Sequence, residues 1–173
     1  MLITIVAIDE EKGIGKNGQL PWHIREDLQL FKQNTLHHSI LMGQTTYDHM
    51  PRKLRDRHTY VCSIDPEYQI TDDPEAEVIH DLEAFLKQHQ DDEEEVFVCG
   101  GASIYRQSYP YCKKAYISFV KGTHDVDTYF DAFNMDDWII EKEVEYEQFI
   151  YREMRRRKRR LNKARLGRRG ARI

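Results

Sequence analysis

Leu2-Ile3-Thr4-Ile5-Val6-Ala7-Ile8 is a nearly continuous apolar run. A strand with one solvated face alternates apolar and polar residues, whereas a strand covered on both faces is apolar throughout. The run therefore predicts a central strand of a sheet. The next segment, Gly13-Ile14-Gly15-Lys16-Asn17-Gly18-Gln19-Leu20-Pro21-Trp22, holds three glycines and a proline and is predicted to be a loop. Loops at strand ends often hold ligands, so this one is either part of a binding site or a plain surface loop.

Short apolar runs and helical patterns alternate along the rest of the chain. Strands are predicted at 40–42, 59–62 and 96–99, and helices at about 25–36, 44–50, 81–90 and 102–109. This alternation is typical of a mainly parallel sheet with helices on its faces. Strands at 115–120, 138–146 and 149–154 follow without long helices, which predicts antiparallel strands at one edge. We expect a single α/β domain.

The composition excludes several classes of protein. Of the 173 residues, 40% are hydrophobic and 32% are charged, which supports a packed core and excludes a wholly disordered chain. No apolar run approaches the roughly 18 residues that cross a bilayer, and no signal peptide is recognisable, so we expect a cytoplasmic protein. Three cysteines without C-x-x-C spacing predict neither a disulfide framework nor a zinc site.

Charge is distributed unevenly along the chain. Residues 152–173 carry twelve Lys or Arg and one acid, which is +11, and residues 1–151 carry fourteen basic and twenty-nine acidic residues, which is −15. We therefore divide the chain into a body, residues 1–155, and a basic tail, residues 156–173. The tail either attracts a polyanion such as nucleic acid, without sequence specificity, or is a solvated appendage with no specific partner.

Asp27 stands out in the predicted helix at 25–36. Ile24, Leu28, Phe31 and Leu36 form its apolar face, and Asp27 lies one turn before Phe31, on or beside that face. Desolvation there would raise the pKa of the carboxyl group, which suits proton chemistry or the binding of a cationic nitrogen heterocycle. The alternative is an acid in the first helical turn that the helix dipole favours.

Two strand-to-helix junctions carry glycine, Gly43 and the pair at 100–101. Bare N–H groups at helix starts could hold a pyrophosphate, or the glycines could serve only tight packing. Neither G-x-G-x-x-G nor G-x-x-x-x-G-K-[ST] occurs, so an ordinary Rossmann or P-loop site has little support. The histidines form no metal-ligand pattern, and no metal site is predicted. Arg52, Arg55 and Arg57 either clamp a ligand carboxylate or form a charged loop.

The order of these features resembles the dihydrofolate reductase family over about residues 1–155. The matching motifs are the glycine-rich loop ending in L-P-W at 15–22, D-L-x-x-F at 27–31, M-G-x-x-T-[WY] at 42–47, the ligand arginine at Arg57, G-G-x-x-[IV]-Y at 100–105 and D-T-x-F at 127–130. The resemblance implies an eight-stranded, mostly parallel, twisted sheet with flanking helices. It also implies NADPH-dependent reduction of 7,8-dihydrofolate to 5,6,7,8-tetrahydrofolate for one-carbon metabolism, with hydride transfer to C6 and protonation at N5. We expect a monomer that binds dihydrofolate and antifolates.

The resemblance also implies a set of site residues. The catalytic residues would be Asp27, Leu20, Trp22 and Ser118. The substrate-binding residues would be Ile5, Val6, Ala7, Leu28, Phe31, Met50, Leu54, Arg57 and Cys99. The cofactor-binding residues would be Ala7, Ile14, Gly15, Gly18, Gly43, Gln44, Thr45, Thr46, Ser63, His80, Gly100, Gly101, Ala102, Ser103, Ile104, Tyr105 and Thr128. Asp27 would hydrogen-bond the pterin, and Arg57 would pair with the glutamate α-carboxylate of the substrate.

One departure from the family concerns the cofactor. Relatives with a strong preference for NADPH commonly place arginines where this chain has Gln44 and Ser103, so we expect weaker discrimination against NADH. Ser63 and His80 are candidate contacts of the 2′-phosphate. Two alternative functions are a reductase of riboflavin synthesis, against which Asp27 and Arg57 argue, and a non-enzymatic nucleic-acid-binding protein that acts through the basic tail.

Overall fold

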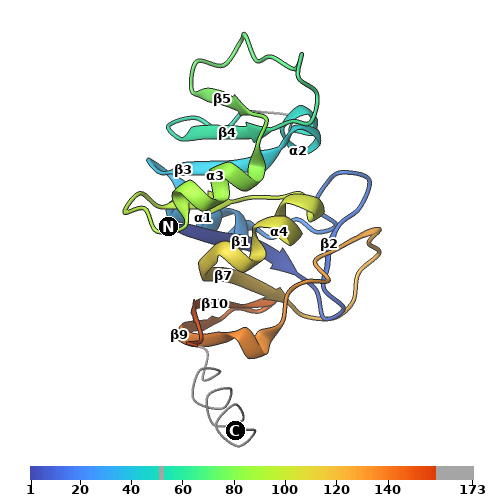
Figure 1. Cartoon of the computed structure of the whole chain (residues 1–173). Helices are drawn as coiled ribbons and strands as arrows, with labels where there is room; N and C mark the ends of the chain where they lie inside the picture. Colours follow the sequence, from blue (N-terminus) through green and yellow to red (C-terminus); the bar gives the residue numbers. More distant parts are fainter. Residues whose placement is uncertain (51–52, 159–173) are drawn as a thin grey trace, which may run out of the picture.

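The computed structural model describes residues 1–50 and 53–158. Its main element is an eight-stranded sheet with the order β5-β4-β3-β6-β1-β7-β10-β9 (Figure 1). The strands are β1 (Leu2–Ile8), β3 (Ser39–Gly43), β4 (His58–Cys62), β5 (Ala76–Ile79), β6 (Val96–Val98), β7 (Cys112–Val120), β9 (Trp138–Glu145) and β10 (Phe149–Arg156). Neighbours from β5 to β7 are parallel, and β10 is antiparallel to both β7 and β9. The predicted fold class and the central place of β1 are confirmed.

Helices cover both faces of the sheet. They are α1 (Arg25–Thr35), α2 (Gln44–His49), α3 (Leu82–His89) and α4 (Ala102–Ser108), with short 3-10 turns at Tyr109–Tyr111 and Met135–Asp137. Phe31 of α1 and Tyr47 of α2 pack with Ile3 on one face. Phe85 of α3 and Ile104 of α4 pack with Leu2 on the other face. Because successive residues of a strand point to opposite faces, the apolar run of β1 supplies both cores.

Three strands were not predicted. Two belong to a small sheet of β2 (Gly13–Gly15) and β8 (Thr128–Tyr129), and the third is β5 at the edge of the main sheet. β2 and β8 are too short to show a period of two, and β5 is a four-residue strand in which no residue is fully buried. Strand β7 also begins at Cys112, earlier than predicted, because Leu2 of β1 pairs with that residue.

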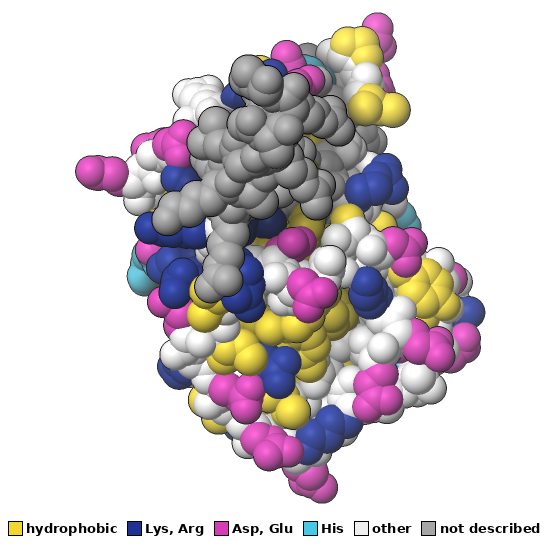
Figure 2. All heavy atoms as spheres, turned by 60° about the horizontal axis from the view of Figure 1, so that its bottom comes forward, with side chains coloured by type: hydrophobic (Ala, Val, Ile, Leu, Met, Phe, Trp, Pro, Cys, Tyr) yellow, Lys and Arg dark blue, Asp and Glu magenta, His cyan; other side chains and the backbone are white. Residues whose placement is uncertain are grey.

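The edge strand β9 and its neighbour β10 carry many charged side chains. Arg152 Nε lies 2.7 Å from a carboxylate oxygen of Glu143, and Arg155 Nε lies 3.6 Å from one of Glu141. Figure 2 shows this end of the molecule with Lys and Arg side chains beside Asp and Glu side chains around a smaller apolar area. Charged side chains at a sheet edge oppose pairing with the edge of another chain.

Strand β10 continues past the predicted body boundary to Arg156. The guanidinium of Arg156 lies 4.4 Å from the ring centroid of Trp138 and donates a hydrogen bond to the carbonyl of Cys112. A truncation that spares the sheet must therefore begin after this residue. Residues 159–173, most of the predicted basic tail, lie outside the described residues, and the division of the chain stays a prediction. Within the described ranges, no helix is long and apolar enough to cross a membrane.

Candidate functional site

The candidate site lies where the parallel strands end, around the carboxyl end of β1. The chain passes from β1 through the loop and α1 to β3, and it returns later to place β6 between these two strands. A reversal of strand order of this kind leaves a crevice at the carboxyl ends of the strands. In Figure 1 the loop after β1, α2 and the start of α4 gather on this side of the sheet.

Asp27 is held by a residue of the sheet. It lies in the first turn of α1, and its Oδ1 accepts a hydrogen bond of 2.6 Å from the hydroxyl of Ser118 on β7. Ser118 pairs with Ala7 in the ladder between β1 and β7, which fixes the hydroxyl at the end of the central strands. Burial raises the pKa of Asp27, and the hydrogen bond from Ser118 opposes part of that rise. The carboxyl group is thus oriented and poised for proton chemistry.

Predicted substrate-binding residues gather on the face that carries α1. Ile5 is buried in the cluster of that face, where the half-buried side chains of Phe31, Met50, Leu54 and Cys99 pack against it. Leu28 is exposed on the same helix as Phe31, with 38% of its surface accessible. Val6 differs, because its side chain packs with the cluster on the opposite face. An apolar wall therefore lies next to Asp27 and can hold a flat ring.

Arg57 precedes β4 at the far end of this wall. It is buried, and its Nε donates a 2.9 Å hydrogen bond to the hydroxyl of Thr35, the last residue of α1. Its Nη1 donates a hydrogen bond of the same length to the carbonyl of Arg55. Burial lowers the pKa of Arg57, although a guanidinium stays charged in proteins. A buried cation with an oriented fork is suited to a carboxylate of a ligand.

The two glycine junctions are in contact. The N–H of Gly43 donates a 2.9 Å hydrogen bond to the carbonyl of Gly100, so the starts of α2 and α4 lie side by side. A Cβ at Gly43 would lie 3.2 Å from Cγ1 of Ile104, and one at Gly101 would lie 3.2 Å from the Thr46 hydroxyl oxygen. The predicted cofactor-binding residues Thr46, Gly101 and Ile104 thus meet at one place, where larger side chains would be crowded.

A neutral polar group lies beside this junction. Ser63, buried after β4, donates a 2.6 Å hydrogen bond to Oε1 of Gln44. Nδ1 of His80 lies 3.0 Å from the carbonyl of Ser63. The two predicted contacts of the 2′-phosphate, Ser63 and His80, thus come together with Gln44, the residue that replaces an expected arginine. Ser103 lies apart from them on α4, where its hydroxyl accepts a hydrogen bond from Gln107.

The loop after β1 is tied down at both of its ends. β2 pairs with β8, so Gly15 faces Thr128, and the carboxylate of Asp127 accepts a hydrogen bond from the N–H of Asn17. Trp22 packs edge-on against His124 with 5.1 Å between ring centroids. Its buried Nε1 has no hydrogen-bond partner among the described residues, which leaves a donor for a ligand. Between these ends the predicted cofactor-binding residue Gly18 and the predicted catalytic residue Leu20 are exposed.

The sequence did not show what anchors these segments. Asp9 is buried, and its carboxylate accepts backbone hydrogen bonds from Glu11, Gly13 and His124 at 2.7 to 3.1 Å. An Asp that precedes a glycine by a few residues is a common turn signal, and it could have indicated this role. The buried hydroxyl of Tyr105 donates a 2.8 Å hydrogen bond to the carbonyl of Ile5, which joins α4 to β1.

Comparisons with known proteins agree with this geometry. Residues 1–158 match the profile of a family described as dihydrofolate reductase. A dihydrofolate reductase of Mycoplasma genitalium is 33% identical over 151 residues, covering 86% of this chain and 94% of that protein. One of Staphylococcus haemolyticus is 36% identical over 146 residues, covering 84% of each chain. A structure of the Enterococcus faecalis dihydrofolate reductase, complexed with NADP(H) and RAB-propyl, has a TM-score of 0.80 and 30% identity, and the match covers 91% of this chain and 97% of that one.

Proposed function

Because the chain belongs to the dihydrofolate reductase family, we propose that Asp27, Arg57 and the two glycine junctions are the working parts of a reductase site. The protein is an oxidoreductase that uses NADPH to reduce 7,8-dihydrofolate to 5,6,7,8-tetrahydrofolate. The observation that carries the assignment of residues is the half-buried hydrogen bond between Ser118 and Asp27 beside an apolar wall.

Asp27 has the central role in this proposal. As a carboxylate it accepts hydrogen bonds from the amino group and a ring nitrogen of the pterin, and its negative charge favours protonation at N5. Ser118 keeps the carboxylate pointing into the cleft. Phe31 and Leu28 contact the ring and exclude water, which strengthens the interaction between the carboxylate and the pterin. Arg57 binds the α-carboxylate of the glutamate and places the pterin next to Asp27.

The residues present fit a dinucleotide cofactor. Gly43, Gly100 and Gly101 place no side chain at two adjoining helix starts, and Thr45 and Thr46 of α2 add hydroxyl groups there. When bound, NADPH supplies the hydride that reaches C6 of the pterin. Thr45, Ser63 and His80 would meet the 2′-phosphate beside Gln44, and Leu20 with Ile14 would belong to the loop that covers the nicotinamide. We expect NADPH to be preferred over NADH by a small margin.

An absorbance assay tests the proposed function. Purified protein should consume NADPH when 7,8-dihydrofolate is added, and antifolates should inhibit the reaction. The phosphoribosylamino-pyrimidine substrate of riboflavin synthesis should not be reduced, because it offers no glutamate carboxylate to Arg57. Reduction of that pyrimidine with no reaction of dihydrofolate would favour the alternative reductase.

The basic tail is a separate part of the proposal. We propose that it binds polyanions such as nucleic acid through charge alone, and that the body, with its net charge of −14, does not. A chain truncated after Lys158 should keep its turnover and lose its salt-dependent retention on immobilised nucleic acid. Loss of activity in folded truncated protein would place the tail in the catalytic unit.

We also propose that the protein is a monomer in the cytoplasm. Cys62, Cys99 and Cys112 are free thiols, and proteins of the reducing cytoplasm rarely form disulfides. The charged edge at β9 opposes association through that strand. Light scattering of the purified protein would test the monomer, and cell fractionation would test the location.

A further inference from the structure

His89 is a buried imidazole with an unsatisfied nitrogen. It is the last residue of α3, it is 8% exposed, and its ring packs against Phe85 with 4.2 Å between centroids. Its Nδ1 has no hydrogen-bond partner among the described residues, although a carboxylate oxygen of Asp92 lies 3.3 Å away. A buried polar atom without a partner costs free energy, so its position calls for a ligand.

Two carboxylates surround that nitrogen. One ligand atom each from His89, Asp92 and Glu94 lies within 4.8 Å of the other two. In a tetrahedral zinc site with bonds of about 2.0 to 2.1 Å, neighbouring ligand atoms are about 3.3 Å apart. The separation of His89 Nδ1 and Asp92 Oδ2 has this value, and a carboxylate oxygen of the exposed Glu94 lies within 4.8 Å of both.

From this arrangement we propose that His89, Asp92 and Glu94 bind a divalent transition-metal ion, zinc before others, at the amino-terminal edge of the sheet. One imidazole and two carboxylates neutralise the ion and leave a fourth position for water. The imidazole favours Zn²⁺, Co²⁺ and Ni²⁺ over Mg²⁺ and Ca²⁺, which prefer oxygen ligands alone. The five consecutive acids at 91–95 add a negative field that attracts cations.

Neighbouring groups hold the two acids in place. The buried hydroxyl of Ser39 donates a hydrogen bond to a carboxylate oxygen of Glu94. The amino-terminal ammonium of Met1 donates hydrogen bonds to the backbone carbonyls of Asp92 and Glu94, at 2.5 and 2.7 Å. Hydrogen bonds to ligand carboxylates orient them and are a common feature of metal sites. Glu94 also lines an adjoining cavity of about 460 Å³, through which water and an ion can enter.

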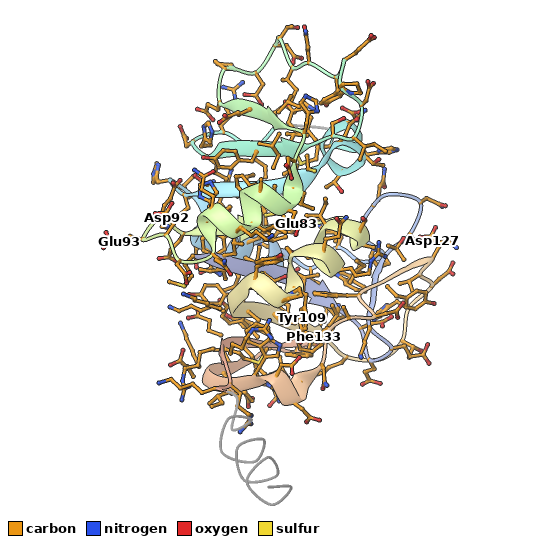
Figure 3. All side chains as sticks on the ribbon, in the orientation of Figure 1. Glu83, Asp92, Glu93, Tyr109, Asp127 and Phe133 are labelled. Atoms are coloured by element: carbon orange, nitrogen blue, oxygen red, sulfur yellow. The ribbon has the colours of Figure 1, made fainter. Side chains whose placement is uncertain are left out.

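The proposed site is remote from the catalytic cleft. Figure 3 shows Asp92 and Asp127 on opposite sides of the molecule, and Asp127 holds the loop of the cleft. The metal would connect the end of α3 with the segment that leads into β6. Because the end of α3 and the hydrogen bond from Ser39 to Glu94 fix these neighbouring ligands only in the folded chain, the ion should bind the folded chain more tightly than the unfolded one. It should therefore raise thermal stability and leave turnover unchanged.

Calorimetric titration of the full chain with Zn²⁺ alone tests the proposal. The wild-type chain, first treated with a chelator, should bind one ion, and H89Q should weaken binding at least about tenfold. D92N and E94Q alter exposed residues, so they test the same site without disturbing the core, and they should weaken binding as well. H58Q is the matched control, because His58 lines the adjoining cavity and pairs with Glu77 at 2.9 Å, outside the proposed ligands.

Two further measurements sharpen the result. Zn²⁺ should raise the melting temperature of the wild-type chain and of H58Q, and it should not raise that of D92N. Co²⁺ should give the visible absorption of a tetrahedral ion without a thiolate charge-transfer band, because no cysteine is among the ligands. No saturable binding by the wild-type chain, or equal affinity in the wild-type chain, H89Q and D92N, would overturn the proposal.

Discussion

The two halves of the cleft meet their ligands with different chemistry. On the substrate side, Asp27 and Arg57 are charged groups held by the hydroxyls of Ser118 and Thr35. On the side proposed for the 2′-phosphate, Gln44 and Ser63 are neutral and bond to each other. A partly desolvated charge that a fixed hydroxyl orients favours a ligand with an opposite charge or a donor at one defined position. Neutral groups that bond to each other have hydrogen-bond partners whether or not a ligand is present.

This difference indicates where binding energy and selectivity arise. Charge-assisted hydrogen bonds are roughly twice as strong as neutral ones, and they depend on the ligand's own charge. Substitutions of Asp27 or Arg57 should therefore strongly reduce turnover or substrate binding, whereas a substitution on the phosphate side can increase the affinity for NADPH.

The largest effect is expected for D27N. Turnover should fall about 300-fold or more, equivalent to about 3.4 kcal/mol, because an amide cannot carry the charge that favours a protonated pterin. The residual rate should increase as the pH is lowered, since the solvent can then protonate the substrate. Steady-state kinetics over a range of pH would measure both effects.

Two controls separate chemistry from folding in this variant. Glu26 is the exposed neighbour of Asp27 in the same helical turn, and E26Q should keep the wild-type rate. Burial raises the pKa of Asp27 above its unfolded value of 3.8, so this group favours folding most below that value and loses its contribution as pH rises through the folded pKa. D27N should consequently be at least as stable as the wild-type chain at neutral pH. A near wild-type rate for D27N would remove Asp27 from the mechanism.

The next largest effect is expected at Arg57. R57A should weaken the binding of dihydrofolate by about 2 to 4 kcal/mol, because the substrate's carboxylate loses a charge-assisted pair in a partly dry cleft. R57K keeps the charge but loses the forked guanidinium that Thr35 and Arg55 orient. Its affinity for dihydrofolate should therefore lie between those of the wild-type chain and R57A. A reduced pterin that lacks glutamate should bind equally well to all three proteins, and equal losses for both substrates would point to misfolding.

A smaller gain is expected on the phosphate side. Q44R should tighten NADPH by about 1 to 2 kcal/mol and leave NADH nearly unaffected, because only the former has a 2′-phosphate. Dissociation constants for both cofactors measure this. Q88R, which adds the same charge on exposed α3, is the control for a general attraction of anions. An equal gain in affinity for NADH would contradict the proposal that the absence of an arginine at position 44 weakens binding of the 2′-phosphate.

The smallest effect is expected for S118A. The hydrogen bond from Ser118 lowers the pKa of Asp27 against the effect of burial, so its removal should raise that pKa further. The acidic limb of kcat/KM should move to higher pH, while the rate at high pH changes less than tenfold. An unchanged pH profile would mean that the Ser118 hydroxyl does not influence the pKa of Asp27.

The features that could be predicted from the sequence are those that leave a local pattern. The apolar run at 2–8 indicates its burial directly, and Asp27 is conspicuous on an apolar helical face. Thr35 and Arg57 are not local to each other, and no pattern indicates that a threonine at a helix end holds an arginine 22 positions later. The alignment of Gln44 with Ser63 likewise depends on the register of β3 and β4.

The strands that escaped prediction have a common cause. Edge strand β5 and the pair β2 and β8 draw their stability from partners elsewhere in the chain. His89 is a different case, since Asp92 and Glu94 follow it closely in the sequence, but their placement around its Nδ1 depends on where α3 ends.

The position of β10 in the strand order affects how the protein is made. β10 is the last strand among the described residues, yet it lies between β7 and β9. On the ribosome, β7 therefore emerges with one edge unpaired and keeps it until Phe149–Arg156 has followed. A chain that has not yet produced β10 leaves β7 with an unpaired apolar edge, so the sheet closes only after β10 has been made.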